Sequence, residues 1–327
     1  MNFQETKNVF NKIFKNQLKD YEVREILVSL YEKGETAEEI AGAMEIMKNH
    51  SLKVLVDDEF KNKIIDNCGT GGDKSGSFNI STTVSFVLAG AGSYVAKHGN
   101  RSITSRSGSA DVLEKIGFNL NLSPMQHAML LQNSGFTFMF AQQHHQAMKY
   151  IMPIRKSIPH RTIFNLLGPL TNPANVQKQL IGVFHQNFIS PVIEALQIAK
   201  IDSAIVISSR DGMDEASISD ISDYKMLKNG NISDGEIDPI KLGFTKSSFA
   251  EIQGGDVNKN AEILLGVLKG EILDAKRDIV LLNSALAFIS DGKARDIQDG
   301  IEIAKDSINS GKAFQRLKLI IDMSKKI

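Results

Sequence analysis

The sequence predicts an α/β protein in which a small all-helical part joins a larger domain with a central, mostly parallel sheet flanked by helices. Three observations support this prediction. The first fifty residues carry apolar side chains at three- and four-residue steps, without a strand pattern. From residue 64 onward, short apolar runs alternate with helical stretches. Polar, glycine-bearing segments follow several of these runs, as they do at the carboxyl ends of parallel strands.

Three helices are expected in the first fifty residues. Apolar positions at helical spacing run from Val9 to Leu18 and again from Val23 to Tyr31. Thr36 with Glu39 forms a capping box that begins a third helix. We expect residues 1–64 to form a small helical domain that packs on the larger domain or on a second subunit.

Five strands are expected between residues 63 and 208, with helices between them. The strands are Lys63–Asp66, Ser93–Lys97, Thr137–Phe140, Leu180–Phe184 and Ala204–Ser208. The intervening helical patterns include Ser81–Ala91, Ala110–Ile116 and a helix with a capping box at Ser123. Beyond Ala261 the pattern is again helical. We therefore assign residues 65–152 and 179–327 to the α/β domain.

Residues 153–175 interrupt this alternation. The segment contains Gly168 and four prolines, which break any long regular element: Pro153, Pro159, Pro169 and Pro173. Two interpretations stay open, a crossing between two domains and an ordinary loop. In the first, residues from about 153 to 178 belong with the helical domain.

The composition argues against nucleic-acid and membrane partners and excludes an intramolecular disulfide. Lysine plus arginine and aspartate plus glutamate number 38 each in 327 residues, so no bulk field attracts nucleic acid or an anionic membrane. The single cysteine, Cys68, excludes an intramolecular disulfide and fits a reducing compartment. No run approaches the ~18 apolar residues of a membrane span, and no signal pattern begins the chain. We expect a cytoplasmic protein without nucleic-acid or membrane partners.

A glycine-rich segment, residues 69–73, follows the first predicted strand. Glycines allow the backbone to turn through positive φ and bring its N–H groups close to an anion. Hydroxyls from Ser77 to Thr82 lie where the next helix begins, and a helix N-terminus holds phosphate oxygens well. The segment lacks the pattern of a nucleotide P-loop and of a dinucleotide fingerprint. On its own, such a glycine cluster is typical of a turn.

A second polar segment, residues 97–109, follows the next predicted strand. It carries Lys97, an imidazole, an amide, two guanidinium groups and several hydroxyls. Such a run on its own is typical of a solvated loop, but here a strand precedes it and a helix follows. Two strand ends of this kind, facing one crevice, predict a site for a phosphorylated substrate, with Lys97 as a phosphate partner.

Three further groups are candidates for substrate or metal binding. The adjacent carboxylates Asp214 and Glu215 follow the fifth predicted strand and suggest Mg²⁺, although exposed acidic pairs are common. Arg155 could bind a carboxylate bidentately, or it could be a surface arginine. His144-His145 has no third ligand at a sensible spacing, so we interpret the pair as pocket or packing residues.

In these residues the chain closely resembles anthranilate phosphoribosyltransferases. The matching segments occur in order along the chain and are residues 69–73, 78–82, 97–102, 107–111, 144–145, 161–173 and 214–215. Any one segment is moderate evidence, whereas the ordered set is strong. The helical start and end also fit, so the resemblance covers essentially the whole chain.

The resemblance implies transfer of 5-phosphoribose from 5-phosphoribosyl 1-diphosphate to the amine of anthranilate, with release of diphosphate. The donor would be bound by Gly69, Gly72, Asp73, Ser77, Asn79, Ile80, Ser81, Thr82, Lys97, His98, Gly99, Asn100, Arg101, Ser102 and Ser109. Anthranilate would be bound by Gly69, Asn100 and Arg155. Mg²⁺, as two ions, would be bound by Ser81, Asp214 and Glu215.

The resemblance also implies a homodimer formed through the helical part. No residue is required to act as a general base, because the aromatic amine already carries a lone pair and can lose its proton late. Catalysis is therefore expected to come from electrostatics and positioning by Lys97, Asn100 and Arg155.

Two other functions compete with this interpretation. A pyrimidine nucleoside phosphorylase shares the fold, but it uses phosphate as the nucleophile and has no need of Arg155. A non-catalytic, nucleic-acid-binding relative should show a basic face and altered metal residues. This chain is neutral overall and keeps Asp214 and Glu215.

Overall fold

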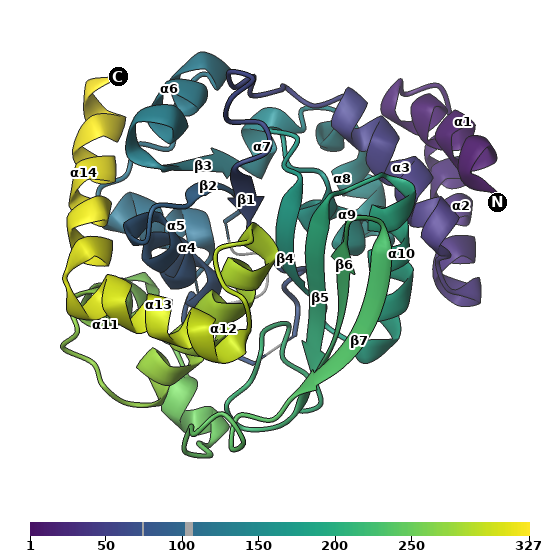
Figure 1. Cartoon of the computed structure of the whole chain (residues 1–327). Helices are drawn as coiled ribbons and strands as arrows, with labels where there is room; N and C mark the ends of the chain where they lie inside the picture. Colours follow the sequence, from purple (N-terminus) through teal and green to yellow (C-terminus); the bar gives the residue numbers. More distant parts are fainter. Residues whose placement is uncertain (74, 102–106) are drawn as a thin grey trace.

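The computed structural model describes residues 1–73, 75–101 and 107–327, and they fold around a seven-stranded sheet (Figure 1). Its order is β3-β2-β1-β4-β5-β6-β7. The strands are β1 Ile64–Asp66, β2 Tyr94–Gly99, β3 Phe136–Phe140, β4 Lys178–Gly182, β5 Ser203–Ser209, β6 Ser222–Lys228 and β7 Asn231–Ile237. The first five are parallel and match the five expected strands, with ends shifted by one or two residues.

The sequence analysis did not predict β6 and β7, which extend the sheet as an antiparallel hairpin. Charged residues interrupt both strands, since one face of the hairpin is partly exposed. The sequence feature that indicates this hairpin is Asn229-Gly230, which lies between β6 and β7. Both residues have positive φ, 50° and 79°, as the tight turn of a two-residue hairpin requires.

Fourteen α-helices are described. They are α1 Phe3–Phe14, α2 Asp20–Lys33, α3 Ala37–Asn49, α4 Ile80–Gly90, α5 Ser109–Lys115, α6 Pro124–Ser134, α7 Ala141–His144, α8 Met148–Lys156, α9 Phe164–Leu170, α10 Ile189–Ile198, α11 Val257–Leu268, α12 Ala275–Asp291, α13 Ile297–Asn309 and α14 Lys312–Lys326. The three helices expected at the N-terminus are confirmed, and so is the capping box that begins α3.

Helices cover both faces of the sheet. On one face, α4 and α12 join the C-terminal helices in a core that includes Ile65, Val95 and Ile207. On the other face, α10 and the N-terminal helices bury Ile181 and Val206. Figure 1 shows α1–α3 at one end of the molecule and α14 at the opposite end. Within the described residues, no helix has both the length and the apolar character needed to cross a membrane.

The proline-bounded segment is not an ordinary loop. It contains part of α8 and the whole of α9, each with a proline inside it, Pro153 and Pro169. Phe164 of α9 shares a buried core with the N-terminal helices, and its ring centroid lies 6.0 Å from that of Phe10. The segment therefore packs against the helical part of the chain.

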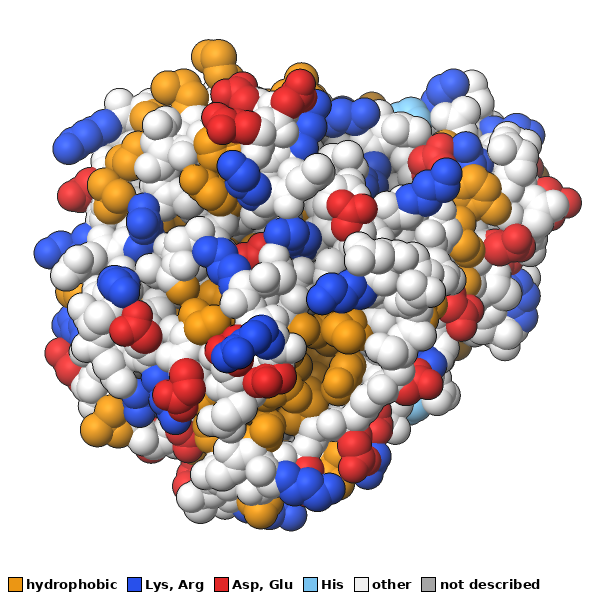
Figure 2. Space-filling view, viewed as in Figure 1, with side chains coloured by type: hydrophobic (Ala, Val, Ile, Leu, Met, Phe, Trp, Pro, Cys, Tyr) orange, Lys and Arg blue, Asp and Glu red, His pale blue; other side chains and the backbone are white. Residues whose placement is uncertain are grey.

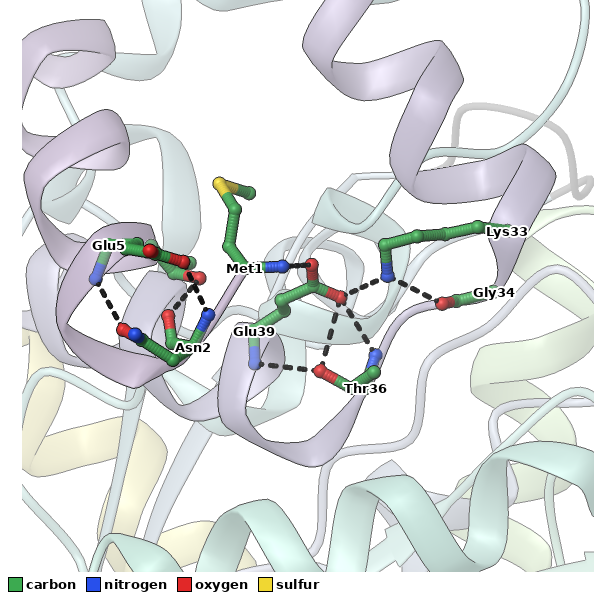
Figure 3. Close-up of polar contacts among 8 residues, drawn as sticks. Met1, Asn2, Glu5, Lys33, Gly34, Thr36 and Glu39 are labelled. Atoms are coloured by element: carbon green, nitrogen blue, oxygen red, sulfur yellow. Dashed lines mark hydrogen bonds and ion pairs between the residues drawn. The ribbon is translucent and has the colours of Figure 1, made fainter.

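A buried carboxylate stabilises the helical part (Figure 3). Glu39 has a side chain with no exposed area, and it accepts hydrogen bonds from Lys33 at 2.5 Å, from the Met1 amine at 2.7 Å and from the Thr36 N–H at 3.0 Å. Burial by itself would raise the pKa of Glu39, but the hydrogen bonds from Lys33, the Met1 amine and Thr36 outweigh burial and lower this pKa.

Charges of both signs are mixed on the molecular surface. On the face shown in Figure 2, lysine and arginine side chains lie among aspartate and glutamate, and the described residues form no broad basic area there. This agrees with the equal numbers of acidic and basic residues in the sequence.

Candidate active site

The expected binding segments meet where the strand order reverses. From β1 the chain adds β2 and β3 on one side, and it then returns to place β4 and β5 on the other side. Ligands of open α/β sheets bind outside the carboxyl ends of the strands at such a point. Here the Gly71 N–H donates to Asp214 Oδ2 at 2.6 Å, and the Thr70 N–H donates to the Gly182 carbonyl at 2.9 Å. The loops after β1 and β5 are therefore in direct contact.

Glycine is required at several positions of the loop after β1. Gly71 and Gly72 have φ of +66° and +81°, which favours residues without a Cβ. A Cβ at Gly69 would lie 2.7 Å from Asp214 Oδ2. In the same loop, Asp73 Oδ1 accepts the Ser75 N–H at 3.2 Å, whereas the buried Oδ2 has no hydrogen-bond partner among the described residues. The loop thus places a buried carboxylate oxygen, without a described hydrogen-bond partner, next to the backbone contact with Asp214.

Lys97 lies beneath the N-terminus of α4. Its side chain is 1% exposed, and Nζ donates to Ser81 Oγ at 3.3 Å and to the Asn67 carbonyl at 3.4 Å. Asn67 in turn donates to the Ser81 carbonyl at 2.7 Å. Ile80 begins the helix, and Thr82 is buried in its first turn. A cation and a helix N-terminus therefore converge on one place, which favours a bound anion.

Two carboxylates face this place from the loop after β5, the buried Asp214 and the half-buried Glu215. Burial, followed by the charge of Asp73, raises the pKa of Asp214 to about 8. Burial, followed by the charge of Asp214, raises the pKa of Glu215 well above its usual value, although Lys97 opposes this. Both line a cavity of about 10 Å³ together with Gly69 and Ser81. That space accommodates about one water molecule or one ion.

The oxygen ligands of this cavity fit Mg²⁺. Two carboxylates and the Ser81 hydroxyl are hard donors, and Mg²⁺ usually takes one or two carboxylates and completes its shell with water and substrate phosphates. The described residues contain no group of three His, Cys, Asp or Glu side chains arranged around a metal position. A cation here therefore depends on the substrate for part of its coordination.

The start of the second polar segment connects β2 with α5 and α9. His98 donates its N–H to Asp66 Oδ1 at 3.3 Å, and its Nδ1 lies 3.0 Å from the Gly168 carbonyl. A Cβ at Gly99 would lie 2.4 Å from Ser109 Oγ. The Asn100 carbonyl accepts the Ser109 hydroxyl at 3.2 Å. These contacts bring the two ends of the segment together.

Arg101 is held by carboxylates of α5. Its guanidinium pairs with Asp111 and Glu114, both at 2.8 Å, and these hydrogen bonds raise its pKa. The expected donor ligand Ser102 lies outside the described residues.

The remaining donor-binding candidates lie where the glycine loop leads into α4. Ser77 accepts a hydrogen bond from the Ser75 hydroxyl at 3.1 Å. Asn79 Oδ1 accepts from Asn260 of α11 at 3.0 Å, and Asn79 Nδ2 donates to the Ser107 carbonyl at 3.4 Å. Asn79 thus connects the glycine loop, the second polar segment and α11.

Arg155 lies on α8, in the proline-bounded segment. Burial lowers its pKa. The guanidinium donates to Asn165 Oδ1 at 3.3 Å and lies 5.4 Å from the centre of the Phe164 ring. These contacts place a half-buried cation against an aromatic wall, an arrangement that suits a flat carboxylate ligand. The described contacts of the Arg155 guanidinium are with α8 and with the proline-bounded segment, and none of them is with the glycine loop.

His144 and His145 are buried, at 2% and 4% exposure. His144 Nδ1 lies 2.7 Å from the Leu52 carbonyl, and the His145 ring is 5.2 Å from that of His98. Burial lowers the pKa of all three histidines, so they are neutral near pH 7. Cys68 is partly buried, and burial raises the pKa of its thiol, which keeps the thiol protonated.

Sequence reasoning missed several buried polar residues that support the site. Asp66 is fully buried at the end of β1, where burial raises its pKa to about 6, and it accepts from Asn172 at 2.7 Å. Asn67 and Asn260 support Ser81 and Asn79. One of these residues could have been found from the sequence, because Asn260 is a polar residue on the apolar face of α11.

Comparisons with known proteins agree with this geometry. Residues 1–51 match the glycosyl transferase family helical bundle domain, and residues 61–314 match the glycosyl transferase family a/b domain. The anthranilate phosphoribosyltransferase of Oceanobacillus iheyensis is 44% identical over 99% of this chain and 94% of its own length. The chain belongs to the anthranilate phosphoribosyltransferase family. It is accordingly an enzyme of the glycosyltransferase type.

Solved structures of family members share the whole fold. The anthranilate phosphoribosyltransferase of Thermus thermophilus has a TM-score of 0.93 and 31% identity, covering 99% of this chain and 96% of that one. The Saccharomyces cerevisiae enzyme in complex with PRPP and Mg has a TM-score of 0.86 and 26% identity, covering 98% of this chain and 91% of that one.

Proposed function

We propose that this family member catalyses Mg²⁺-dependent transfer of 5-phosphoribose from 5-phosphoribosyl 1-diphosphate to the amine of anthranilate. The products are N-(5-phosphoribosyl)anthranilate and diphosphate, in tryptophan biosynthesis. The observation that carries the proposal is the meeting of Ser81, in the first turn of α4, with Asp214 and Glu215 at one cavity, beside which Lys97 donates to the Ser81 hydroxyl.

The chain's own residues would bind and orient the donor. Backbone N–H groups of the glycine loop and the start of α4 would hold diphosphate oxygens, and Lys97 would add a positive charge. Ser81, Asp214 and Glu215 would hold Mg²⁺, which we propose to bind as two ions. Bound Mg²⁺ neutralises charge on the departing diphosphate.

Arg155 would hold the carboxylate of anthranilate, with Gly69 and Asn100 as further contacts to that substrate. The described contacts of Arg155 include no carboxylate of the chain, which leaves its guanidinium for an anionic ligand. Orienting the amine toward C1 of the ribose lowers the entropic part of the barrier. No general base is needed in this scheme.

Loss of anthranilate fluorescence tests the proposal directly. We expect purified protein, phosphoribosyl diphosphate and Mg²⁺ together to quench the signal, and a sample without Mg²⁺ to remain unchanged. A folded protein that gives no decay would contradict the proposal, and phosphorolysis of thymidine or uridine would then be assayed.

The role of Arg155 can be separated from general effects on α8. We expect Arg155→Ala to raise KM for anthranilate by about 100-fold, since a charged hydrogen bond contributes roughly 1.5–3 kcal/mol, and to leave KM for the donor nearly unchanged. Lys156→Ala, on the same helix, is the control and should change neither value. Equal effects on both substrates would contradict the assignment.

We also propose a homodimer formed through the helical part. The partly exposed aromatic side chains Tyr21 and Tyr31 on α2 support a contact there. Light scattering after gel filtration would distinguish a dimer from a monomer.

A further inference from the structure

Helix α12 packs beside β4 and β5 (Figure 1). A buried amide of this helix, Asn283, lines the carboxylate cavity. Asn283 of α12 is 1% exposed and lines the cavity together with Asp214 and Glu215. Its neighbours along the helix include the buried Leu282 and Ala285. A polar side chain in such a place needs hydrogen-bond partners inside the protein.

The partners of Asn283 lie in the backbone of the acidic loop. The Ala216 N–H donates to Asn283 Oδ1 at 2.9 Å, and Asn283 Nδ2 donates to the Ala216 carbonyl, also at 2.9 Å. The second proton of Nδ2 goes to the Ile279 carbonyl at 2.9 Å. One side chain thus binds both the carbonyl and the N–H of the residue that follows Glu215.

On the other side of the carboxylate pair, the Met213 N–H donates to Asp211 Oδ1 at 3.2 Å, and backbone contacts add to this. The Ser209 N–H donates to the Met213 carbonyl at 3.0 Å. A Cβ at Gly182 would lie 1.5 Å from the Asp214 carbonyl oxygen, so β4 and the loop are in close contact. Asn283 therefore holds the peptide of Ala216, directly after Glu215, while the next residue, Ser217, donates to Ser222 and Asp211.

We propose that Asn283 is a positioning residue for the divalent cation. By holding the Ala216 peptide, it sets the direction in which Glu215 and Asp214 project into the cavity, although it does not itself bind the ion. The inference rests on the proposed function, because that function assigns the cation to these two carboxylates. Groups that orient metal ligands typically change metal affinity by about 10- to 100-fold when they are removed.

The test compares wild-type protein with Asn283→Ala, Asn283→Asp and a control, Ser290→Ala. Ser290 lies on the same helix, and its buried hydroxyl donates to the Gln179 carbonyl at 2.8 Å, so the control removes a buried contact to β4 instead. Three properties are measured: hydrogen exchange at the Ala216 amide without metal, binding of Mn²⁺ in the presence of inorganic diphosphate, and steady-state KM for anthranilate.

We expect Asn283→Ala to accelerate exchange at Ala216 and to weaken Mn²⁺ binding about 10- to 100-fold, with an unchanged KM for anthranilate. Asn283→Asp keeps the side-chain shape and the acceptor, loses the donors and adds a negative charge at the cavity. Because that charge by itself would strengthen Mn²⁺ binding, weaker binding in this variant also supports the role of Asn283 if the alanine variant does not fold. Ser290→Ala should match wild type in all three measurements.

The outcomes separate the two proposals. Wild-type Mn²⁺ affinity in both folded Asn283 variants would overturn the role of Asn283 and leave the proposed function standing. Weakened Mn²⁺ binding with equally weakened anthranilate binding would also overturn this role, because a general structural defect explains that result. Failure of the wild-type protein to bind Mn²⁺ with diphosphate would overturn the metal assignment itself.

Discussion

Glu39 in the helical part and Asp214 at the carboxyl end of β5 are both buried carboxylates, yet their pKa values are displaced in opposite directions. Glu39 has a cation on each oxygen, Lys33 on one and the Met1 amine on the other. Asp214 has a single backbone N–H at 2.6 Å and further carboxylates nearby. Folding alone satisfies Glu39, whereas no hydrogen bond or ion pair joins Asp214 to a cationic side chain among the residues that the structure describes. The partners around each group thus distinguish a structural carboxylate, Glu39, from the one that we propose to bind a cation, Asp214.

The strongest test removes the charge of the functional pair. We expect Asp214→Asn with Glu215→Gln to lower kcat/KM at a fixed Mg²⁺ concentration by at least about 100-fold. The same change should leave the metal-free protein as stable as wild type, or more stable, because it removes two carboxyl groups whose ionised forms are disfavoured in the folded protein. Steady-state kinetics and urea unfolding in EDTA measure the two effects. A less stable metal-free variant would show that this pair stabilises the fold as Glu39 does.

The second test uses pH. Because the pKa of Asp214 is raised to about 8, a cation must displace a proton at lower pH. We expect Mn²⁺ affinity to rise by up to about tenfold per pH unit between pH 6 and 8. Calorimetric titration at pH 6, 7 and 8 measures this, with Glu39→Gln as a control that should show the same slope. A flat profile would contradict the raised pKa.

The same shift has a consequence for the metal-free protein. Since the folded-state pKa of Asp214 lies above its unfolded value of 3.8, the native state holds more protons than the unfolded state between these values. The contribution of Asp214 to stability therefore falls as the pH rises from about 4 to 8. Asp214→Asn should remove that contribution to the pH dependence of unfolding.

The third test concerns the structural carboxylate. We expect Glu39→Gln to lower the free energy of unfolding by roughly 1–3 kcal/mol, because Lys33, the Met1 amine and Thr36 lose a charged, buried acceptor. Kinetic constants should stay at wild-type values. Glu38→Gln, the exposed neighbour on α3, is the control and should change neither property. Loss of activity at unchanged stability would overturn the distinction between the two carboxylates.

The smallest effect is expected at Lys33. Its side chain is 42% exposed, so water screens the pair with Glu39. Lys33→Met should therefore cost at most about 1 kcal/mol in the free energy of unfolding, less than Glu39→Gln. If Lys33→Met lowered the free energy of unfolding as much as Glu39→Gln or more, Lys33 alone, rather than the full set of donors, would account for the stabilising effect of Glu39.

Local patterns were enough to predict most of the fold. Apolar runs such as Ala204–Ser208 are buried on both faces of the sheet, and their hydrophobicity alone identifies them. The β6–β7 hairpin was missed because one of its faces is partly exposed, so its composition resembles a loop. Only the Asn229-Gly230 turn distinguished it.

The site was predictable in its residue types and less so in its contacts. Loops after strands indicated Lys97 and Asp214, because parallel strands bring their carboxyl ends to one edge. The pairing of Arg101 with Asp111 and Glu114, and the contact of Asn283 with Ala216, depend on how helices pack on the sheet. No spacing along the chain encodes such contacts.

The position of β1 has a consequence for the growing chain. This strand of three residues pairs with β2 at Tyr94, but its other neighbour, β4, begins only at Lys178. During synthesis at roughly 5–20 residues per second, one edge of β1 stays open on the order of ten seconds. Until β4 emerges and fills the gap, the half-made sheet exposes a hydrogen-bonding edge to which a chaperone or another nascent chain can bind.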